Sequence, residues 1–363
     1  MNAADIGRAR LASLGLSQRR FATPEDVVTT LGALQAQDYE GAKWALALRL
    51  PTDRLDRTEA ELETAIAEAR IVRSWPMRGT LHLVPGEDLG WMLALMASRV
   101  IAGSERRLRQ LELDAAQLGR SGKLLAKALA KGPVTREALL ARLDAAGIST
   151  AQQRGYHILT WHAQQGLICL GPMQGKQQTF VLLADWVKKP RQLARDAALG
   201  EIARRYFRSH GPATLQDFAR WTGLSMADAR TGLEAVRDEL AESQHDRHSC
   251  WGPANAPEPP AAPAALLLPG FDEFILGYRD RDAVLAAAYA ERICPGKNGM
   301  FLPTIVLDGR VAGTWKRQLK KKDVLIALSP FGKLKKAERE AIAASAADYG
   351  RYLRREARIS QSD

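Results

Sequence analysis

Hydrophobic residues recur at helical spacing over much of this 363-residue chain, in short segments bounded by glycine, proline and capping residues. Residues 23–34 show the pattern well: Thr23 can cap a helix, Pro24 suits its first position, and apolar residues then recur up to Leu34. Several of these helices precede two short apolar segments that are joined by a turn. The pattern predicts an α+β protein that is mainly α-helical.

The clearest repeat of this pattern lies at residues 119–188. Three predicted helices end there at glycines, and the apolar segments 167–170 and 179–183 flank a polar turn. Three helices and a two-stranded wing within roughly 60 residues are typical of a winged helix. The third helix is expected to open at Ser149 and to expose Arg154 near its start. Residues 1–118 and 189–252 show the same order, although the wing of the last copy is indistinct.

The final part of the chain differs in character. Residues 253–264 are rich in proline and are predicted to form a linker. Residues 265–363 contain apolar strand segments, a turn at Asp308-Gly309 that suits a type I′ hairpin, and a long charged helix. We therefore predict three winged-helix modules (1–118, 119–188 and 189–252), the linker, and a small C-terminal α+β domain (265–363).

Charge adds a candidate partner. The net charge is +11 and the pI is near 9.7, a balance that favours polyanions, above all nucleic acid. Residues 316–336 hold eight basic side chains and one acid, a net charge of +7. This segment is either a solvated surface or a phosphate-binding surface, and its composition favours neither.

Other features indicate the compartment. The cysteines, Cys169, Cys250 and Cys294, are widely spaced and suggest no disulfide framework, so a reducing cytoplasm is expected. The N-terminus lacks the pattern of a signal peptide, and the apolar stretch 89–100 is too short to span a bilayer. Residues 245–250 offer two histidines and a thiol, but no fourth ligand follows at a familiar spacing. We interpret this segment as a polar wing or loop and expect no metal.

The sequence Leu34-Gln35-Ala36-Gln37-Asp38-Tyr39 is the most unusual chemical feature. On a continuous helix, side chains at i and i+2 lie about 200° apart and cannot converge. The helical pattern weakens here, and in an extended or helix-terminal conformation Gln35 and Gln37 can face one point. The plainer alternative is that both are surface residues at the end of a helix.

In a basic chain with winged-helix patterns, this motif resembles the Gln-apolar-Gln motif of the AlkZ-like DNA glycosylases (the helix-turn-helix 42 family). Residues 78–82 (Arg-Gly-Thr-Leu-His) and 267–274 (Leu-Leu-Pro-Gly-Phe-Asp-Glu-Phe) resemble two further segments of that family, in the same order. The resemblance implies a C-shaped arrangement of the three modules around a concave basic channel. It also implies a DNA-contacting hairpin in the C-terminal domain, which we expect at Val306–Trp315.

The resemblance further implies an activity, the excision of alkylated or interstrand-crosslinked purines from double-stranded DNA by a monofunctional glycosylase. An N7-alkylguanine is already cationic and leaves without strong acid catalysis, so the enzyme mainly has to place a water. Gln35 and Gln37 are the expected catalytic residues, and Asp38 and His82 are expected to shape the pocket. No metal or organic cofactor is implied, and the protein is expected to be a monomer or weak dimer. The expected DNA-binding residues are Arg73, Arg78, Arg154, Lys316, Arg317, Lys320, Lys321 and Lys322.

Whether His82 belongs to the catalytic pocket stays open at this point, because a histidine in a strand more often makes a structural hydrogen bond. The tryptophans are interpreted as core residues, with Trp75 alone considered as a stacking platform beside a basic turn. The alternative function is a non-enzymatic winged-helix transcriptional regulator. Such a protein would bind one particular DNA sequence, normally as a dimer.

Overall fold

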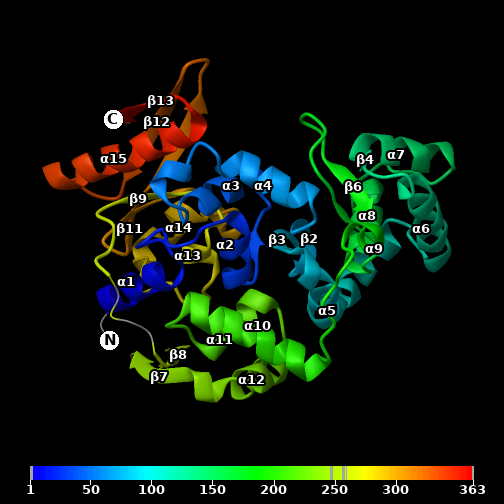
Figure 1. Ribbon diagram of the computed structural model, residues 1–363, viewed down its shortest axis with the longest axis horizontal. Coiled ribbons are helices and arrows are strands. Elements are labelled where there is room, and N and C mark those ends of the chain that lie inside the picture. The colour runs from blue at the N-terminus through cyan, green and yellow to red at the C-terminus, as the bar shows by residue number, and fades with distance from the viewer. Residues whose placement is uncertain (1–2, 246–247, 256–257, 259, 362–363) are drawn as a thin grey trace. The chain divides into compact units, whose positions relative to one another are not determined.

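The computed structural model describes residues 3–245, 248–255, 258 and 260–361, and its architecture is α+β with open sheets (Figure 1). The chain forms two compact units, Met1–Glu61 with Leu199–Asp363, and Leu62–Ala198. It passes from one unit to the other within two helices, α4 (Thr58–Ala67) and α10 (Arg195–His210). The combination of helices and open sheets confirms the predicted α+β class.

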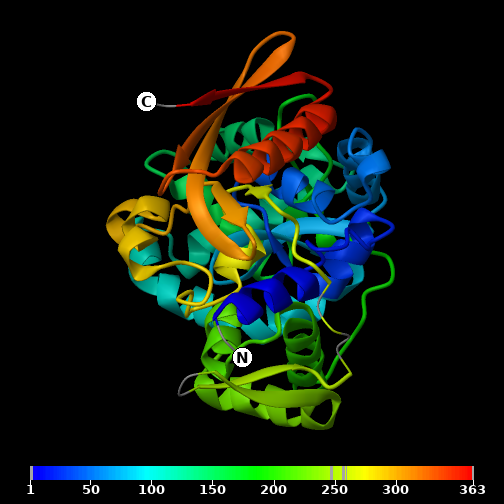
Figure 2. The same ribbon diagram turned by 90° about the vertical axis from the view of Figure 1, so that its left-hand side faces the viewer.

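The first unit joins the N-terminal helices to the C-terminal part of the chain. Its main sheet has the order β13-β12-β11-β10-β9, and α15 packs against this sheet (Figure 2). The pairs are antiparallel except for β12 with β13. Besides α10, its elements are α1 (Ala3–Ser13), α2 (Pro24–Leu31), β1 (Leu34–Gln35), α3 (Tyr39–Ala47), α11 (Leu215–Thr222), α12 (Met226–Glu234), β7 (Leu240–His245), β8 (His248–Pro253), β9 (Leu266–Leu268), α13 (Glu273–Leu276), α14 (Ala290–Ile293), β10 (Thr304–Leu307), β11 (Arg310–Leu319), β12 (Asp323–Pro330), α15 (Lys336–Leu353) and β13 (Glu356–Gln361).

Aromatic side chains hold the main sheet, α3 and α15 together. The Tyr349 ring lies 4.9 Å from that of Trp44 and 5.2 Å from that of Trp315, both at steep angles. Both indoles also donate hydrogen bonds to β9, from Trp44 to the Leu267 carbonyl at 2.7 Å and from Trp315 to the Leu268 carbonyl at 2.8 Å. The buried polar ends of these rings are therefore satisfied, and they fix the position of β9.

A buried ion pair lies just beyond β9. The guanidinium of Arg49 makes two parallel hydrogen bonds to the carboxylate of Asp272, at 2.9 and 3.0 Å, and both side chains are fully buried. Arg49 also donates to the carbonyls of Leu14 and Ala45. A paired and fully hydrogen-bonded charge is tolerated in a core, whereas removal of one partner leaves the other unpaired at a cost of about 3–5 kcal/mol.

Local start and stop signals fix most helix boundaries where they were predicted. Thr23 and Asp26 form a capping box ahead of α2, and Gly32 follows the helix with φ of 80°. The turn between β10 and β11 has positive φ at Asp308 and Gly309, 45° and 78°, as a type I′ turn requires.

One local prediction was wrong, and one feature that the sequence left indistinct became clear. Helix α8 begins at Arg154 and not at Ser149, because Gln152 and Gln153 take up left-handed conformations with φ of 51° and 71°. The wing that the sequence left indistinct is a regular hairpin of β7 and β8. Its short polar strands carry no continuous apolar pattern that would have revealed it.

The second unit contains a sheet with strand order β3-β2-β5-β6-β4, and α5 packs against β2 and α8. No helix in the described parts of the chain has both the length and the apolar composition needed to cross a membrane. The elements of this unit are β2 (Ile71–Met77), β3 (Thr80–Pro85), α5 (Leu89–Gln110), α6 (Ala115–Leu129), β4 (Val134–Thr135), α7 (Arg136–Ala145), α8 (Arg154–Gln164), β5 (Ile168–Leu170), β6 (Thr179–Leu182) and α9 (Leu183–Trp186).

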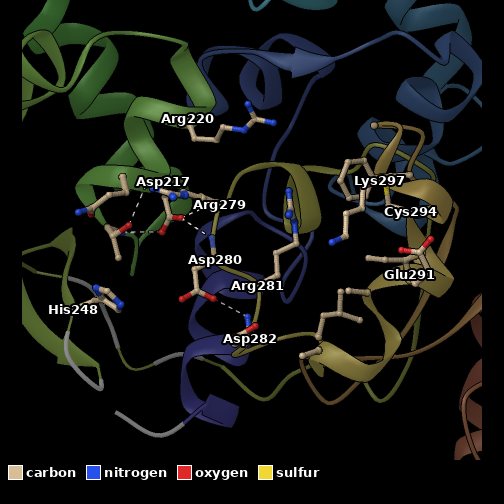
Figure 3. Close-up of a pocket in the computed structure, with 18 residues that line it drawn as sticks. Asp217, Arg220, His248, Arg279, Asp280, Arg281, Asp282, Glu291, Cys294 and Lys297 are labelled. Carbon is tan, nitrogen blue, oxygen red and sulfur yellow. Dashed lines mark hydrogen bonds between the residues drawn. The ribbon is translucent and has the colours of Figure 1, made fainter.

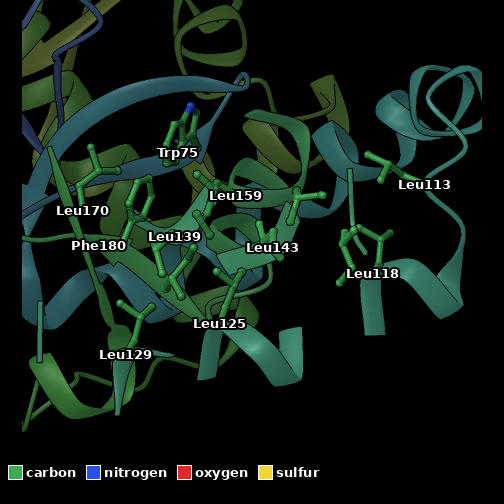
Figure 4. Packing of buried hydrophobic residues seen from close by; sticks show 14 of the residues in the cluster. Trp75, Leu113, Leu118, Leu125, Leu129, Leu139, Leu143, Leu159, Leu170 and Phe180 are labelled. Atoms are coloured by element: carbon green, nitrogen blue, oxygen red, sulfur yellow. The ribbon is translucent and has the colours of Figure 1, made fainter. Parts of the chain in front are cut away.

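Leucines from α6, α7 and α8 form the core of this unit with Phe180 and Trp75 (Figure 4). Trp75 is buried there, so it is a core residue and does not offer a stacking platform. A buried histidine lies beside this core in α8: Nε2 of His162 is 2.8 Å from the Ser121 hydroxyl of α6. Burial disfavours the charged imidazolium and lowers the pKa of His162 to about 4.

We predict that protonation of His162 destabilises the protein in mild acid. The imidazole of the unfolded chain binds a proton near pH 6.5, whereas the folded one stays neutral until about pH 4. The unfolded state therefore binds more protons in this window, and stability falls as the pH falls. The non-titrating variant His162→Gln should lose less stability over this window, by about 3 kcal/mol, in urea unfolding followed by tryptophan fluorescence. Identical pH dependence in the two proteins would exclude His162 as the cause.

Candidate active site

The two candidate glutamines lie in a non-helical segment between two helices, Gln35 at the end of a short strand and Gln37 in a bend. After Gly32 the chain runs through β1, and Asp38 begins α3 as its N-cap residue, with φ of −92° and ψ of 101°. Gln35 is buried, with 8% of its surface exposed, whereas Gln37 and Asp38 are exposed. The segment therefore avoids the helical geometry that would send the two carboxamides in opposite directions.

The backbone of Gln35 is anchored by a buried carboxylate. Its N–H donates to Oε1 of Glu273 at 3.2 Å. The other oxygen, Oε2, accepts a hydrogen bond from the Trp221 indole at 2.9 Å and lies 3.3 Å from Nε2 of His210. Glu273 is fully buried, so these donors replace the water that a carboxylate otherwise requires.

The histidine of this network is itself held on two sides. Nδ1 of His210 lies 2.8 Å from the Ser209 hydroxyl, and its ring stacks on Tyr206 at 4.6 Å. The Tyr206 hydroxyl donates to the Gly277 carbonyl at 2.7 Å, and burial, with the nearby charge of Asp217, raises the pKa of Tyr206. The anchor of Gln35 thus connects α10, α11 and α13 of the first unit.

Asp38 lies over the turn that follows β9. A Cβ atom at position 41 would lie 2.6 Å from Oδ2 of Asp38 and 3.4 Å from Cβ of Pro269, so a glycine there leaves room for the carboxylate. Pro269 and Glu273 both belong to the segment 267–274, which sequence comparison with the family had singled out. The structure brings this segment directly beneath the glutamine motif.

Arg317, expected to bind phosphate, lies near enough to Asp38 and Glu40 to be affected by their negative charge. Its guanidinium on β11 donates to the Tyr349 hydroxyl and is only partly exposed. Burial alone would lower the pKa of Arg317, but Tyr349 and the negative charges of Asp38 and Glu40 outweigh it and raise the pKa. Arg317 therefore stays charged beside the candidate site.

The remaining expected cations of this unit lie on the β11–β12 hairpin, which projects from the main sheet (Figures 1 and 2). Lys316 is exposed on β11, and the turn itself consists of the exposed lysines at positions 320, 321 and 322. Arg355 stabilises this turn by donating to the carbonyls of Lys320 and Lys321. The turn therefore presents three ammonium groups on an ordered backbone.

The turn of the hairpin expected to contact DNA, Val306–Trp315, packs against α1. Arg8 of α1 donates to both carboxylate oxygens of Asp308 at its turn, at 2.9 and 2.6 Å. Gly7 packs so closely on Gly309 that a Cβ at position 7 would lie 2.4 Å from its carbonyl oxygen. α1 therefore buries Gly309 but leaves Asp308 exposed, and whether this hairpin contacts DNA stays a prediction; the next turn along the chain is cationic and exposed.

In the second unit, His82 is fully buried in β3. Arg78 lies 3.1 Å from its Nε2, and the Thr80 carbonyl lies 2.9 Å from its Nδ1. Because a guanidinium can only donate, Nε2 accepts, and Nδ1 carries the proton that is donated to Thr80. These contacts fix one neutral tautomer of His82 and orient Arg78.

The other two expected cations of this unit are also held by neighbours. Arg73 donates to the Gln178 carboxamide at 3.0 Å. Arg154 donates to the carbonyls of Ser149, at 3.0 Å, and Leu111, and so braces the start of α8. Among the residues of the rejected metal motif, His245 and His248 pair across the β7–β8 hairpin, while Asp246 and Arg247 lie outside the described residues.

Comparison with known proteins identifies the family. The family model of the AlkZ-like DNA glycosylases matches residues 28–352, nearly the whole chain. The chain belongs to the AlkZ-like DNA glycosylase family. It is therefore an enzyme of the DNA N-glycosylase class, a hydrolase that acts on DNA.

The sequence and structure comparisons of this AlkZ-like glycosylase both lead to Streptomyces sahachiroi. A protein named interstrand DNA cross-link repair glycosylase is 30% identical over 321 residues, which cover 82% of this chain and 85% of that protein. The solved structure of the DNA glycosylase AlkZ aligns with a TM-score of 0.80 and 25% identity, over 99% of this chain and 100% of the other. The whole chain, and not one module of it, shares the AlkZ fold.

Sequence reasoning missed the residues that support Gln35. Glu273 stood within a recognised segment, but no pattern distinguished it from Asp272, its neighbour in the ion pair with Arg49. His210 and Trp221 lie in the segment 189–252, where no sequence pattern singles them out. Their meeting point depends on contacts between positions separated by up to 63 residues, which spacing cannot reveal.

We predict that Glu273→Gln slows base excision by this AlkZ-like glycosylase without weakening DNA binding. The variant keeps the size of the side chain but loses the charge that orders Gln35, and a loss of about 1.4 kcal/mol corresponds to roughly tenfold in rate. Glu239→Gln, which removes a carboxylate paired with Arg204 and Arg208 in the same unit, is the matched control. Single-turnover rates and thermal midpoints of both variants separate positioning from stability. Equal rates in the two variants would argue against a positioning role.

Proposed function

We propose that the enzyme hydrolyses the N-glycosidic bond of alkylated purines of the N7-alkylguanine type, including purines joined in interstrand crosslinks, as a monofunctional glycosylase. The observation that carries this proposal is the non-helical Gln35-Ala36-Gln37 segment, tied to a buried carboxylate at Gln35 and exposed at Gln37. The name of the relative, an interstrand DNA cross-link repair glycosylase, supports the crosslinked substrate.

The chemistry required of the site is modest. An N7-alkylated guanine carries a positive charge and departs as a neutral base, while positive charge develops on the sugar. Carboxamide oxygens of Gln35 and Gln37 accept hydrogen bonds from one water and hold it beside the anomeric carbon. Asp38 adds negative potential that favours the cationic sugar, and either it or bulk water takes the released proton. No metal or organic cofactor enters this proposal.

The exposure of the motif suits a bulky substrate. A purine that is covalently joined to the opposite strand cannot be turned fully out of the duplex. Gln37 and Asp38 lie at the protein surface, so the duplex itself can approach them. We propose that the enzyme reads the lesion from the face of the duplex, with His82 contributing to the wall of the pocket through its ordering of Arg78.

DNA is held, in this proposal, by winged-helix modules at 1–118, 119–188 and 189–252 and by the C-terminal domain. The order α6, β4, α7, α8, β5, β6 in the second segment supports the assignment, as does the β7–β8 wing in the third. The C-shaped arrangement, the cytoplasmic location and the monomeric or weakly dimeric state stay predictions. The proposed phosphate-binding residues are Arg73, Arg78, Arg154, Lys316, Arg317, Lys320, Lys321 and Lys322.

The central test uses duplex DNA with a single N7-methylguanine, and alkaline cleavage to reveal abasic sites. Wild type should produce abasic sites, and a Gln35→Ala/Gln37→Ala variant should lose at least about 100-fold in single-turnover rate, since removal of one preorganised polar group typically costs 10²–10³. Gln165→Ala, an exposed glutamine at the end of α8, is the control for loss of a carboxamide. Undiminished excision by the double variant would remove the two glutamines from the mechanism.

A second prediction concerns the lysine turn of the β11–β12 hairpin. Lys320→Gln/Lys321→Gln/Lys322→Gln should weaken binding to duplex DNA and reduce the slope of log K against log salt by up to about 3, because each phosphate contact contributes about 0.9. The excision rate at saturating enzyme should stay near that of wild type. A triple control removes three exposed lysines of the α6 region, at positions 123, 127 and 131. Identical salt slopes for the two triple variants would exclude the turn from DNA binding.

A further inference from the structure

The first unit contains a cavity of about 770 Å³ that has no part in the proposed chemistry. It lies between α11, the segment that follows α13, and the region of α14 (Figure 3). Its wall combines apolar side chains such as Leu285 and Phe301 with four acids and four cations. The formal charges of the lining therefore balance, but the acids and the cations have different hydrogen-bond partners.

Three of the four acids accept hydrogen bonds from backbone N–H groups. Asp217 is fully buried, and its Oδ1 accepts the N–H groups of Arg279 at 2.7 Å and Asp280 at 3.1 Å. Its other oxygen lies 3.9 Å from the guanidinium of Arg10, which comes from outside the cavity. Glu291 accepts the N–H of Gly296 at 2.6 Å. These carboxylates are satisfied within the fold and do not neutralise the cations of the lining by direct contact.

Three cations, by contrast, come from separate elements of the cavity wall. Arg220 comes from α11, Arg281 from the segment after α13, and Lys297 from the short helical turn after α14, and Figure 3 shows the three side chains bordering the same part of the cavity. Within the described part of the chain, no carboxylate lies within 4.0 Å of any of these three groups. Three like charges therefore border the cavity without a direct ion-pair partner among the described residues, although Asp217 and Asp280 lie near enough to act on Arg281 through their charge.

Arg281 is fixed in place by its surroundings. Its Nε donates to the Ile275 carbonyl at 2.7 Å, and its guanidinium lies over the ring of Phe301 at 5.0 Å. Burial, followed by the charge of Arg220, lowers the pKa of Arg281. A bound anion would offset both effects, since it supplies hydrogen-bond acceptors and opposite charge beside these cations.

We propose that this cavity binds a phosphate group between Arg220, Arg281 and Lys297. Two guanidinium groups and an ammonium from three elements match the several oxygens of a tetrahedral phosphate better than a planar carboxylate. The inference rests on the proposed function for the source of the phosphate, which we assign to the backbone of the DNA substrate. A free phosphate is the other source with the same chemistry, and the experiment distinguishes the two.

The test uses the variant Arg220→Gln/Lys297→Gln, because both residues are exposed and their replacement leaves the core intact. The control is Arg57→Gln/Arg292→Gln, which removes two exposed cations of the same unit that do not line the cavity. The first arm measures the dissociation constant of an unmodified 16-base-pair duplex by fluorescence anisotropy over a range of salt. The second arm measures the thermal midpoint of each protein with and without 20 mM inorganic phosphate at constant ionic strength.

Loss of one contact with a DNA phosphate is expected to reduce the slope of log K against log salt by about 1 in the cavity variant, with weaker binding at every salt concentration. The control should keep the wild-type slope. An unchanged slope together with a phosphate-induced rise in thermal midpoint that only the cavity variant loses would support the site and assign it to free phosphate. Equal behaviour of both variants in both arms would overturn the proposal. Since neither arm needs excision, failure of the glycosylase assay on N7-methylguanine is a separate result.

Discussion

The carboxylate of Glu273 connects the glutamine motif to the core of the first unit. It accepts hydrogen bonds from the Gln35 backbone and the Trp221 indole and lies beside His210, and water has no access to it. In a region of low dielectric such contacts are strong, and a broken one leaves a buried charge without compensation. The position of the glutamine motif therefore depends on helices that lie far from it in the sequence.

A second constraint acts on the neighbouring residue. Asp272 is held by Arg49, and β9, which precedes it, is held by the indoles of Trp44 and Trp315. The turn that carries Pro269 and Glu273 is thus fixed at both ends, and it supports Asp38 and Gln35 from below. Small displacements of reacting groups are costly in catalysis, so a site on a short non-helical segment requires support of this kind.

Local chemistry made the elements predictable, and long-range contacts did not show in the sequence. Thr23 with Asp26 fixed the start of α2, and Asp308-Gly309 fixed a hairpin turn, because these signals act over a few residues. The resemblance located Gln35 and the segment around Glu273, but not their contact, which joins residues 238 positions apart. The start of α8 was misplaced because two glutamines adopt left-handed conformations that composition does not reveal.

The first unit is built from both ends of the chain, Met1–Glu61 and Leu199–Asp363. During synthesis, Gln35 leaves the ribosome long before Glu273 and the strands β9–β13 exist. Until then, the glutamine segment has no buried carboxylate to hold it, while the intervening unit can already complete its own leucine core. A truncated or unfinished chain therefore carries the whole glutamine motif and yet lacks the means to hold it in place, so completion of the polypeptide itself acts as the last step of assembling the proposed site.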